Sequence, residues 1–521
     1  MSSPDPFRRS CLLALSLWAG VHAIAAGADQ ISFNVRTYGA AGDGQTLDSP
    51  AINRAIAAAV AIGGGTVFVP AGTYLSGSIR LKSNIHLLLD AGAVILGDKW
   101  DSGAYDPTEP HPFGAYQDGG HTFFHNSLIW GENLTNVSIT GQGMINGGGL
   151  TAWEGKLDEK MGFSRPPPYP QDGGGPVQAA NKAIALKLCK GVLIRDVTIS
   201  QGGWFAILVT GCDNVTIDNV TIDTNRDGMD IDCCRNVMVS NCRVNSPNDD
   251  GICPKSTHVL GEPRITENLT IVNCQVSGFE EGALLNGTLR PAKRGVGRIK
   301  FGTESSGGFR NVTIANCTFR SCMGLALEEV DGGILEDFTI TNLTMTDVRH
   351  YAIYLTTGNR NRTPSLKTSS RMRNILISNV IADGVDRLLG IQVTGLPEQP
   401  IENIRLQNIR LISKGGGTKE DAARNPRELG NDYPDPGAGL GTLPAYGVFA
   451  RHVKNLELAD ITLNYLTEDL RPAASFADVD GLEIDHLKAQ VAAGVRPAVF
   501  AADVRGVTIR NSPTLEKLKY K

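Results

Sequence analysis

Short runs in which aliphatic or β-branched residues alternate with polar ones recur along this chain, and most of them open with asparagine. The clearest runs lie at 136–139, 214–217, 236–239, 268–271 and 311–314, with looser copies at 374–377, 403–406, 455–458 and 506–509. Alternation with a period of two is typical of β-strands. Asn214 and Asn236 are 22 residues apart, and a repeat of that length made of short strands and turns predicts an all-β fold, a parallel β-helix.

The repeated asparagines have two possible roles. Many begin Asn-x-Thr/Ser triplets, which can accept glycans. Asparagine also adopts the left-handed backbone conformation more readily than most residues. In a stack of coils, equivalent asparagines would then lie amide on amide at the same corner, and we favour this ladder.

One segment predicts a helix. Ser49 is suited to the N-cap and Pro50 to the first turn, and the alanine-rich run that follows ends at Gly63. Such a helix would cover the open end of the β-helix, whose strand edges must not stay exposed. Three glycine- and proline-rich stretches, at 154–182, 286–298 and 412–445, predict long loops that wall a cleft.

Residues 1–28 have the pattern of a secretory signal peptide. Arg8 and Arg9 precede a short apolar run, and small residues follow from Ala23 to Ala28. The run is too short for a membrane anchor, which needs about 20 apolar residues. We therefore expect a secreted or periplasmic protein without membrane insertion, whose residues 29–521 form a single β-helix catalytic domain.

Composition narrows the possible partners. The chain has 49 Lys+Arg against 54 Asp+Glu, a net charge of −5, so nucleic acid is not an expected partner. Of the cysteines, Cys189, Cys212 and Cys234 are spaced by about one repeat, as are Cys253 and Cys274, which predicts buried stacks. Cys317 and Cys322 are the best candidates for a disulfide.

The candidate chemistry lies in two acidic motifs, NRDGMDID at 225–232 and NDDGICPKS at 248–256. Asp227 and Asp249 are 22 residues apart, so one coil should bring them about 4.8 Å from each other along the stack, with Asp250 adjacent. Carboxylates that converge repel one another, so at least one pKa should rise. Paired carboxyl groups of this kind serve as acid and base in glycoside hydrolysis, although aspartate is also common at turns.

These motifs, with the segments at 33–59, 63–84 and 302–317, resemble glycoside hydrolase family 28, the polygalacturonase and rhamnogalacturonan hydrolase family. NRDGMDI is similar to the family's Asn-Thr-Asp motif with Arg226 in place of Thr, and NDDGI to its Gly-Asp-Asp motif. The resemblance implies a right-handed, single-stranded β-helix and an inverting hydrolase of pectic polysaccharides or oligosaccharides. By the same resemblance, Asp249 is the general acid, and Asp227 and Asp250 share the base role. No cofactor or metal is implied, and we expect a monomer.

The chain also departs from the family, as a bacterial-type branch would. The family's Gly-His-Gly is expected shortly before GTES, but the stretch there reads GVGRIK at 295–300 and contains no histidine, and we do not assign that role to His258. The family's Arg-Ile-Lys positions are occupied by Ala326 and Glu328. We interpret Arg298, Lys300 and Lys255 as replacement cations for substrate binding, the alternative being solvated turn residues.

The same departure bears on specificity. A carboxylate at 328 would repel a uronate by about 1–4 kcal/mol at 4 Å, which predicts higher activity on rhamnogalacturonan than on polygalacturonic acid. Alternatively, Glu328 pairs with one of the cations and never meets substrate.

Two other functions remain open from the sequence. A polysaccharide lyase or epimerase on the same scaffold would need a cation at the uronate, which Asp227, Asp230 and Asp249 could bind. A glycan-binding protein without catalysis is the other.

Overall fold

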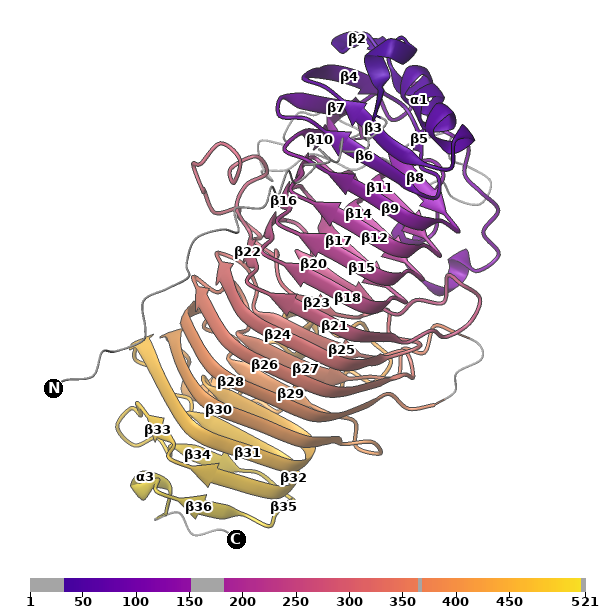
Figure 1. Ribbon diagram of the computed structural model, residues 1–521. Helices are drawn as coiled ribbons and strands as arrows, with labels where there is room; N and C mark the ends of the chain where they lie inside the picture. Colours follow the sequence, from indigo (N-terminus) through magenta and orange to yellow (C-terminus); the bar gives the residue numbers. More distant parts are fainter. Residues whose placement is uncertain (1–31, 151–181, 364–367, 517–521) are drawn as a thin grey trace, which may run out of the picture. The chain divides into compact units, whose positions relative to one another are not determined.

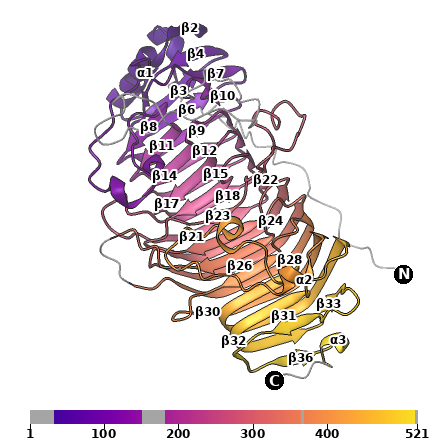
Figure 2. The same cartoon turned by 180° about the vertical axis from the view of Figure 1, so that it is seen from behind.

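The computed structural model describes residues 32–150, 182–363 and 368–516. The predicted signal peptide, 1–28, and all but one residue of the predicted loop 154–182 lie outside these ranges. The described strands wind into a parallel β-helix, coil upon coil in chain order (Figures 1 and 2). Every pairing between its named strands is parallel, so the predicted fold class is confirmed.

Three ladders of strands run along the helix. The first contains β1 Ser32–Asn34, β3 Gly65–Val69, β6 Ile85–Leu89, β9 Thr135–Thr140, β12 Lys190–Arg195, β15 Asp213–Asp218, β18 Arg235–Ser240 and β21 Thr266–Val272. The second contains β2 Asp43–Leu47, β4 Gly72–Ser76, β7 Ala93–Gly97, β10 Met144–Asn146, β13 Thr198–Ser200, β16 Thr221–Asp223, β19 Arg243–Asn245 and β22 Gln275–Ser277. Both continue in the longer strands β24 Phe309–Arg320, β26 Ile334–Thr346, β28 Arg371–Val385 and β30 Ile401–Gly415.

The third ladder carries the acidic motifs. It contains β5 Ile79–Arg80, β8 Ile129–Glu132, β11 Lys182–Lys187, β14 Phe205–Thr210, β17 Asp227–Asp232, β20 Ile252–Lys255, β23 Lys300–Phe301, β25 Leu325–Glu329, β27 Ile353–Thr357 and β29 Ile391–Thr394. The last coils consist of β31 Val448–Thr467, β32 Ala474–Asp485, β33 Lys488–Ala489, β34 Ala498–Phe500, β35 Val504–Arg505 and β36 Thr508–Arg510.

The helical segments are short except for α1. They are η1 Val35–Tyr38, α1 Ser49–Ala61, η2 Gly114–Tyr116, η3 Gly119–His121, η4 Gly148–Leu150, α2 Lys419–Ala422, η5 Pro436–Leu440 and α3 Pro513–Glu516. Across the described ranges, none of them is long and apolar enough to cross a membrane.

Helix α1 lies against the first coils, as predicted. Its alanine and isoleucine face, including Ile52 and Ile56, is buried in the core. Ser49 is the first helical residue and Asp48 holds the cap position, where its carboxylate accepts hydrogen bonds from the backbone N–H groups of Ala41 and Gly42. The helix therefore closes the N-terminal end of the hydrophobic core.

The core follows from the alternation in the strands. Inward positions stack in register from coil to coil, as Val215, Val237, Leu269 and Val312 do. These aliphatic columns merge into one continuous cluster. No coil can bury its own apolar face, so the stack is stable only as a unit.

The asparagine ladder is also confirmed. Asn214, Asn236, Asn268 and Asn311 all have φ between 55° and 57°. The side-chain amide of each later residue donates to the amide oxygen of the one before, at 3.2, 3.0 and 3.1 Å. A second ladder runs through Asn241, Asn273, Asn316, Asn342, Asn379 and Asn408.

The cysteine predictions are correct in part. Cys189, Cys212 and Cys234 form a buried stack. Cys274 stacks with Cys242 and Cys317 at the corner where the first ladder passes into the second, whereas Cys253 lies in the third ladder. The predicted Cys317–Cys322 disulfide is wrong: both thiols are free and buried. Cys317 lies within β24, and the chain turns at Ser321 before Cys322, which separates the two along an extended strand.

Replacing Asn268 tests the ladder. Asn268→Ala loses two amide contacts and places a β-carbon in the left-handed region, so we expect a loss of about 2–4 kcal/mol in unfolding free energy. Asn268→Gly keeps the backbone conformation and should lose only about 1–2 kcal/mol. Urea denaturation followed by circular dichroism measures both, and equal stability of the alanine variant and the wild type would contradict the ladder's role.

Candidate active site

The predicted carboxylates converge at the start of β17 and the turn before β20, but in a different register from the one expected. Asp223 pairs with Asn245, an offset of 22 residues, whereas Met229 pairs with Ile252, an offset of 23. The turn before β20 therefore holds one extra residue. Asp227 consequently lies beside Asp250, with the Gly228 N–H donating to the Asp250 carbonyl at 2.9 Å.

Because of the extra residue, Asp249 lies beside Arg226 and not beside Asp227, the neighbour expected from the sequence. The Arg226 guanidinium donates to Asp249 at 2.5 Å and stacks over the Trp204 ring at 4.1 Å. Trp204, Arg226 and Asp249 thus form one column on three successive coils. Asp249 remains the most accessible of the three predicted catalytic carboxylates, with 28% of its side chain exposed.

Asp250 is buried and surrounded by cations. Arg298 Nε donates to one carboxylate oxygen at 2.6 Å, and Lys300 Nζ lies 3.3 Å from the other. Burial by itself would raise the pKa of Asp250, but the positive charges of Arg298, Lys300 and Lys255 outweigh it and hold that pKa below its ordinary value. Asp250 is therefore ionised at neutral pH.

The pKa of Asp227 is shifted in the opposite direction from that of Asp250. Burial and the charges of Asp249 and Asp250 raise the pKa of Asp227 well above its ordinary value. The sequence prediction that at least one pKa in this cluster rises agrees with this shift. Two neighbouring carboxyl groups with pKa values displaced in opposite directions are the arrangement that acid–base chemistry requires.

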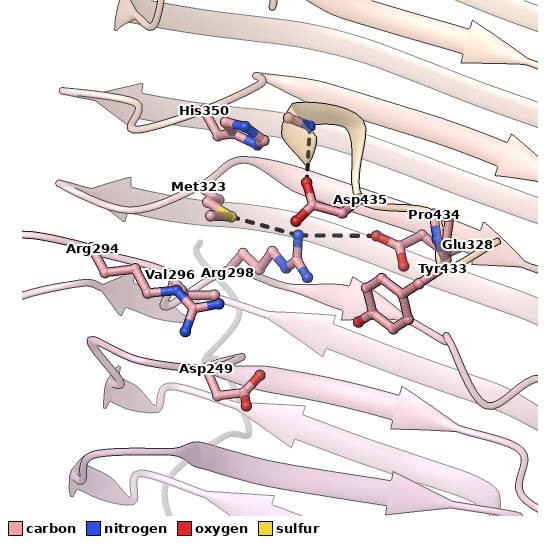
Figure 3. A pocket seen from close by; sticks show the side chains of 11 residues that line it. Asp249, Arg294, Val296, Arg298, Met323, Glu328, His350, Tyr433, Pro434 and Asp435 are labelled. Carbon is pink, nitrogen blue, oxygen red and sulfur yellow. Dashed lines mark hydrogen bonds and ion pairs between the residues drawn. The ribbon is translucent and has the colours of Figure 1, made fainter. Parts of the chain in front are cut away.

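A cavity of about 490 Å³ opens beside Asp249 (Figure 3). Its lining includes Asp249, Arg298, Glu328, His350, Tyr433 and Asp435. In Figure 3, Arg298 lies between Asp249 and Glu328. Part of the predicted loop at 286–298 supplies Arg298, and Tyr433 and Asp435 come from the predicted loop at 412–445, so both stretches contribute to the wall.

The Glu328 carboxylate is paired with two cations. It lies 3.9 Å from Arg298 and 3.7 Å from Lys300, and the residue is 1% exposed. The alternative stated from the sequence, that Glu328 pairs with these cations, is what the structure shows. The argument that Glu328 repels a uronate therefore loses its basis, although Glu328 still lines the cavity.

The third predicted cation, Lys255, forms its ion pair with another carboxylate, Glu304. It donates to Glu304 at 2.9 Å, and Arg362 binds the other oxygen of Glu304 at 2.7 Å. Lys255 is buried, and the structure does not bring it into the cavity lining with Arg298.

His121 is a site residue that the sequence analysis missed. Its Nε2 lies 3.5 Å from Asp230 and 4.0 Å from Glu304. Burial, with the nearby charge of Lys255, lowers the pKa of His121 to about 3, so the ring is neutral. It comes from the connection between β7 and β8, about 100 residues before the acidic motifs, and no spacing marked it. His258, which we left unassigned, packs instead against Phe113 and Tyr116.

One group of side chains has the spacing of a metal site within the described residues. Donor atoms of Asp227, Asp250 and Cys253 lie within 4.8 Å of one another. Burial raises the pKa of the Cys253 thiol well above its ordinary value, and Asp250 already pairs with Arg298 and Lys300. A protonated thiol and a neutralised carboxylate are poor ligands for a hard cation, so these residues do not fit one.

Comparisons with known proteins agree with the predicted family. Residues 32–253 match the family model described as rhamnogalacturonase A/epimerase, pectate lyase-like. The chain is 25% identical to a probable polygalacturonase of Vitis vinifera over 72% of this chain and 73% of the relative. It is also 25% identical to an exopolygalacturonase of Platanus acerifolia, over 74% of this chain and 91% of the relative.

A solved structure supports the fold. The exopolygalacturonase of Thermotoga maritima superposes with a TM-score of 0.61 at 20% identity, covering 84% of this chain and 92% of that one. At this identity the likeness shows the fold, whereas the predicted relationship to the polygalacturonases rests on the sequence relatives.

The cations around Asp250 give a testable pH dependence. Lys300→Met removes a positive charge 3.3 Å from Asp250, so the pKa of Asp250 should rise. If Asp250 must be ionised for turnover, activity is lost on the acid side as pH falls through that pKa, and the acidic limb of kcat/KM moves to higher pH. Lys300→Arg keeps the charge and should leave the limb in place. An unmoved limb in the methionine variant, measured from pH 3 to 8, would show that Asp250 does not control it.

Proposed function

We propose that this homologue of the polygalacturonases is a glycoside hydrolase that cleaves galacturonic-acid-containing pectic polysaccharides or oligosaccharides with inversion. The observation that carries the proposal is that Asp227 and Asp250 lie together directly behind a cavity that Asp249 and Arg298 line, with Arg298 bound to Asp250. Pectic uronides carry carboxylates, and an arginine in the cavity supplies the charge to bind them.

The roles follow from exposure and charge. Asp249 is the general acid: it is the accessible carboxyl of the three, and it delivers a proton to the glycosidic oxygen as the bond to the anomeric carbon breaks. For this step its contact with Arg226 has to open and Asp249 has to take up a proton from solvent, which it then transfers to the leaving oxygen. Asp250, ionised by its cations, accepts a proton from the water that attacks the anomeric carbon from the opposite face.

Asp227 supports the attacking water. The raised pKa of Asp227 favours the protonated form of this carboxyl group beside the ionised Asp250. In this scheme Asp227 orients the water by hydrogen bonding, and Asp250 takes its proton. Arg298 and Lys300 keep Asp250 ionised, and Arg298, which lines the cavity, also attracts the substrate carboxylate.

We also propose that the enzyme acts outside the cytoplasm. The pattern of residues 1–28, basic residues followed by a short apolar run and small residues, supports export. Polymeric pectic substrates are too large to reach an intracellular enzyme intact, which is consistent with this location.

Replacing the acid tests the proposal. Asp249→Asn should lower kcat on the preferred pectic substrate roughly 10²–10⁴-fold, the usual contribution of acid–base catalysis, without a change in the circular dichroism spectrum. Asp383→Asn, at an exposed position on β28, is the matched control and should keep full activity.

Other outcomes identify the two competing functions. Release of an unsaturated product, followed by its ultraviolet absorbance, would indicate a lyase. Tight binding of pectic oligosaccharides without reducing-sugar release, unchanged in Asp249→Asn, would indicate a binding protein.

The stereochemistry is a second, independent test. Proton NMR of the first-formed product should show the anomer opposite to that of the cleaved bond, because one displacement by water inverts the centre. Retention would require a covalent intermediate on a carboxylate, and would remove the water-holding role from Asp227 and Asp250.

A further inference from the structure

The outward face of the third ladder is covered on both sides of the candidate catalytic residues. Along this face, one column on successive coils consists of Asp230, Cys253, Lys300, Ala326, Tyr354, Gln392 and Phe449. All are buried, although they point away from the core of the β-helix. An open groove along the helix axis would leave such residues accessible, so other parts of the chain must cover them.

The connection between β7 and β8, residues 98–128, covers the N-terminal part. Phe124 packs in one cluster with Ala185 and Leu208 of β11 and β14. The His121 ring lies 5.0 Å from that of Phe205 and contacts Asp230. This segment therefore lies over the outward face as far as β17.

The connection between β30 and β31, residues 416–447, covers the C-terminal part. Leu440 and Leu443 pack with Ala326, Tyr354 and Phe449.

Polar contacts fix the same segment. Tyr354 donates to the Pro434 carbonyl at 3.0 Å, and Arg451 donates to the carbonyls of Pro426 and Arg427 at 2.5 and 3.0 Å. Lys300 donates to the Tyr433 hydroxyl at 3.3 Å. The segment is thus tied to the face over β23 to β31, beginning directly beside the cations that hold Asp250.

What remains between the two segments is a cavity rather than a groove. Its volume of about 490 Å³ is that of a small-ligand pocket. Tyr433 and Asp435 form a wall of it, opposite Asp249. A polymer that ran along the helix axis past Asp249 and Arg298 would collide with this wall.

We infer that the enzyme attacks chain ends: one terminus of the pectic chain enters the cavity up to the wall formed by Tyr433 and Asp435, and short units are released from that end. This inference rests on the proposed hydrolysis and specifies its mode. It assigns to residues 416–447 the task of excluding internal segments of the polymer. Short oligosaccharides should be substrates as good as polymer, because only the terminal units are bound.

End-blocked substrates test the inference on the wild-type enzyme. Oligogalacturonides of one length would be prepared unmodified, labelled at the reducing end, labelled at the non-reducing end, and labelled at both. We expect a label at one end to lower kcat/KM at least about tenfold, and a label at the other end to have little effect. Equal rates on all four would overturn the inference, whereas cleavage of none would contradict the proposed function instead.

Product analysis on polygalacturonic acid gives a second readout. Chain-end attack should release one short product from the first time point, with little loss of viscosity per bond cleaved. A ladder of intermediate lengths and a rapid fall in viscosity would overturn the inference.

A pair of variants tests the wall itself. Tyr433→Ala should increase the relative rate on the blocked oligosaccharide, and Tyr433→Phe, which keeps the ring, should not. An unchanged ratio in both variants would remove Tyr433 from the wall.

Discussion

The backbone register between successive coils is the constraint on which the rest of this structure depends. Parallel hydrogen bonding fixes which residue lies above which, so a single inserted residue changes every neighbour that follows it. The turn before β20 carries such an insertion. It places Asp250 beside Asp227, and it leaves Asp249 against Arg226 at the edge of the cavity. The division between buried and accessible carboxylates follows from that one residue.

Charge then differentiates the carboxylates that the register has brought together. Asp250 is enclosed by Arg298 and Lys300, whereas Asp227 has mainly burial and like charges around it. Their pKa values move in opposite directions from the same starting point. Arg298 and Lys300 also hold Glu328, so three coils share one network of alternating charges. Such a network is stable when buried only because each charge has a partner.

The β-helix supplies a rigid base, and its connections supply selectivity. The segments 98–128 and 416–447 are far apart in sequence, yet both lie on the outward face of the third ladder. Their apolar residues pack against outward columns that polar residues occupy elsewhere on the face. The long connections therefore decide what can reach Asp249, while the coils decide what happens there. This separation lets one scaffold serve different substrates by changes in loops alone.

The sequence by itself determined the coil, because alternation of apolar residues and a repeat near 22 leave few folds that bury the apolar face of every strand. It also identified the asparagine ladder, helix α1 and the carboxylates Asp227, Asp249 and Asp250, since each depends on local spacing. The tertiary structure alone decided the one-residue shift of register, the pairing of Glu328 with Arg298 and Lys300, the burial of Lys255 against Glu304, and the approach of His121 and Tyr433. These contacts join residues from different coils or from connections more than 100 residues away. No local pattern encodes them, because they depend on how the connections fold back over the stack.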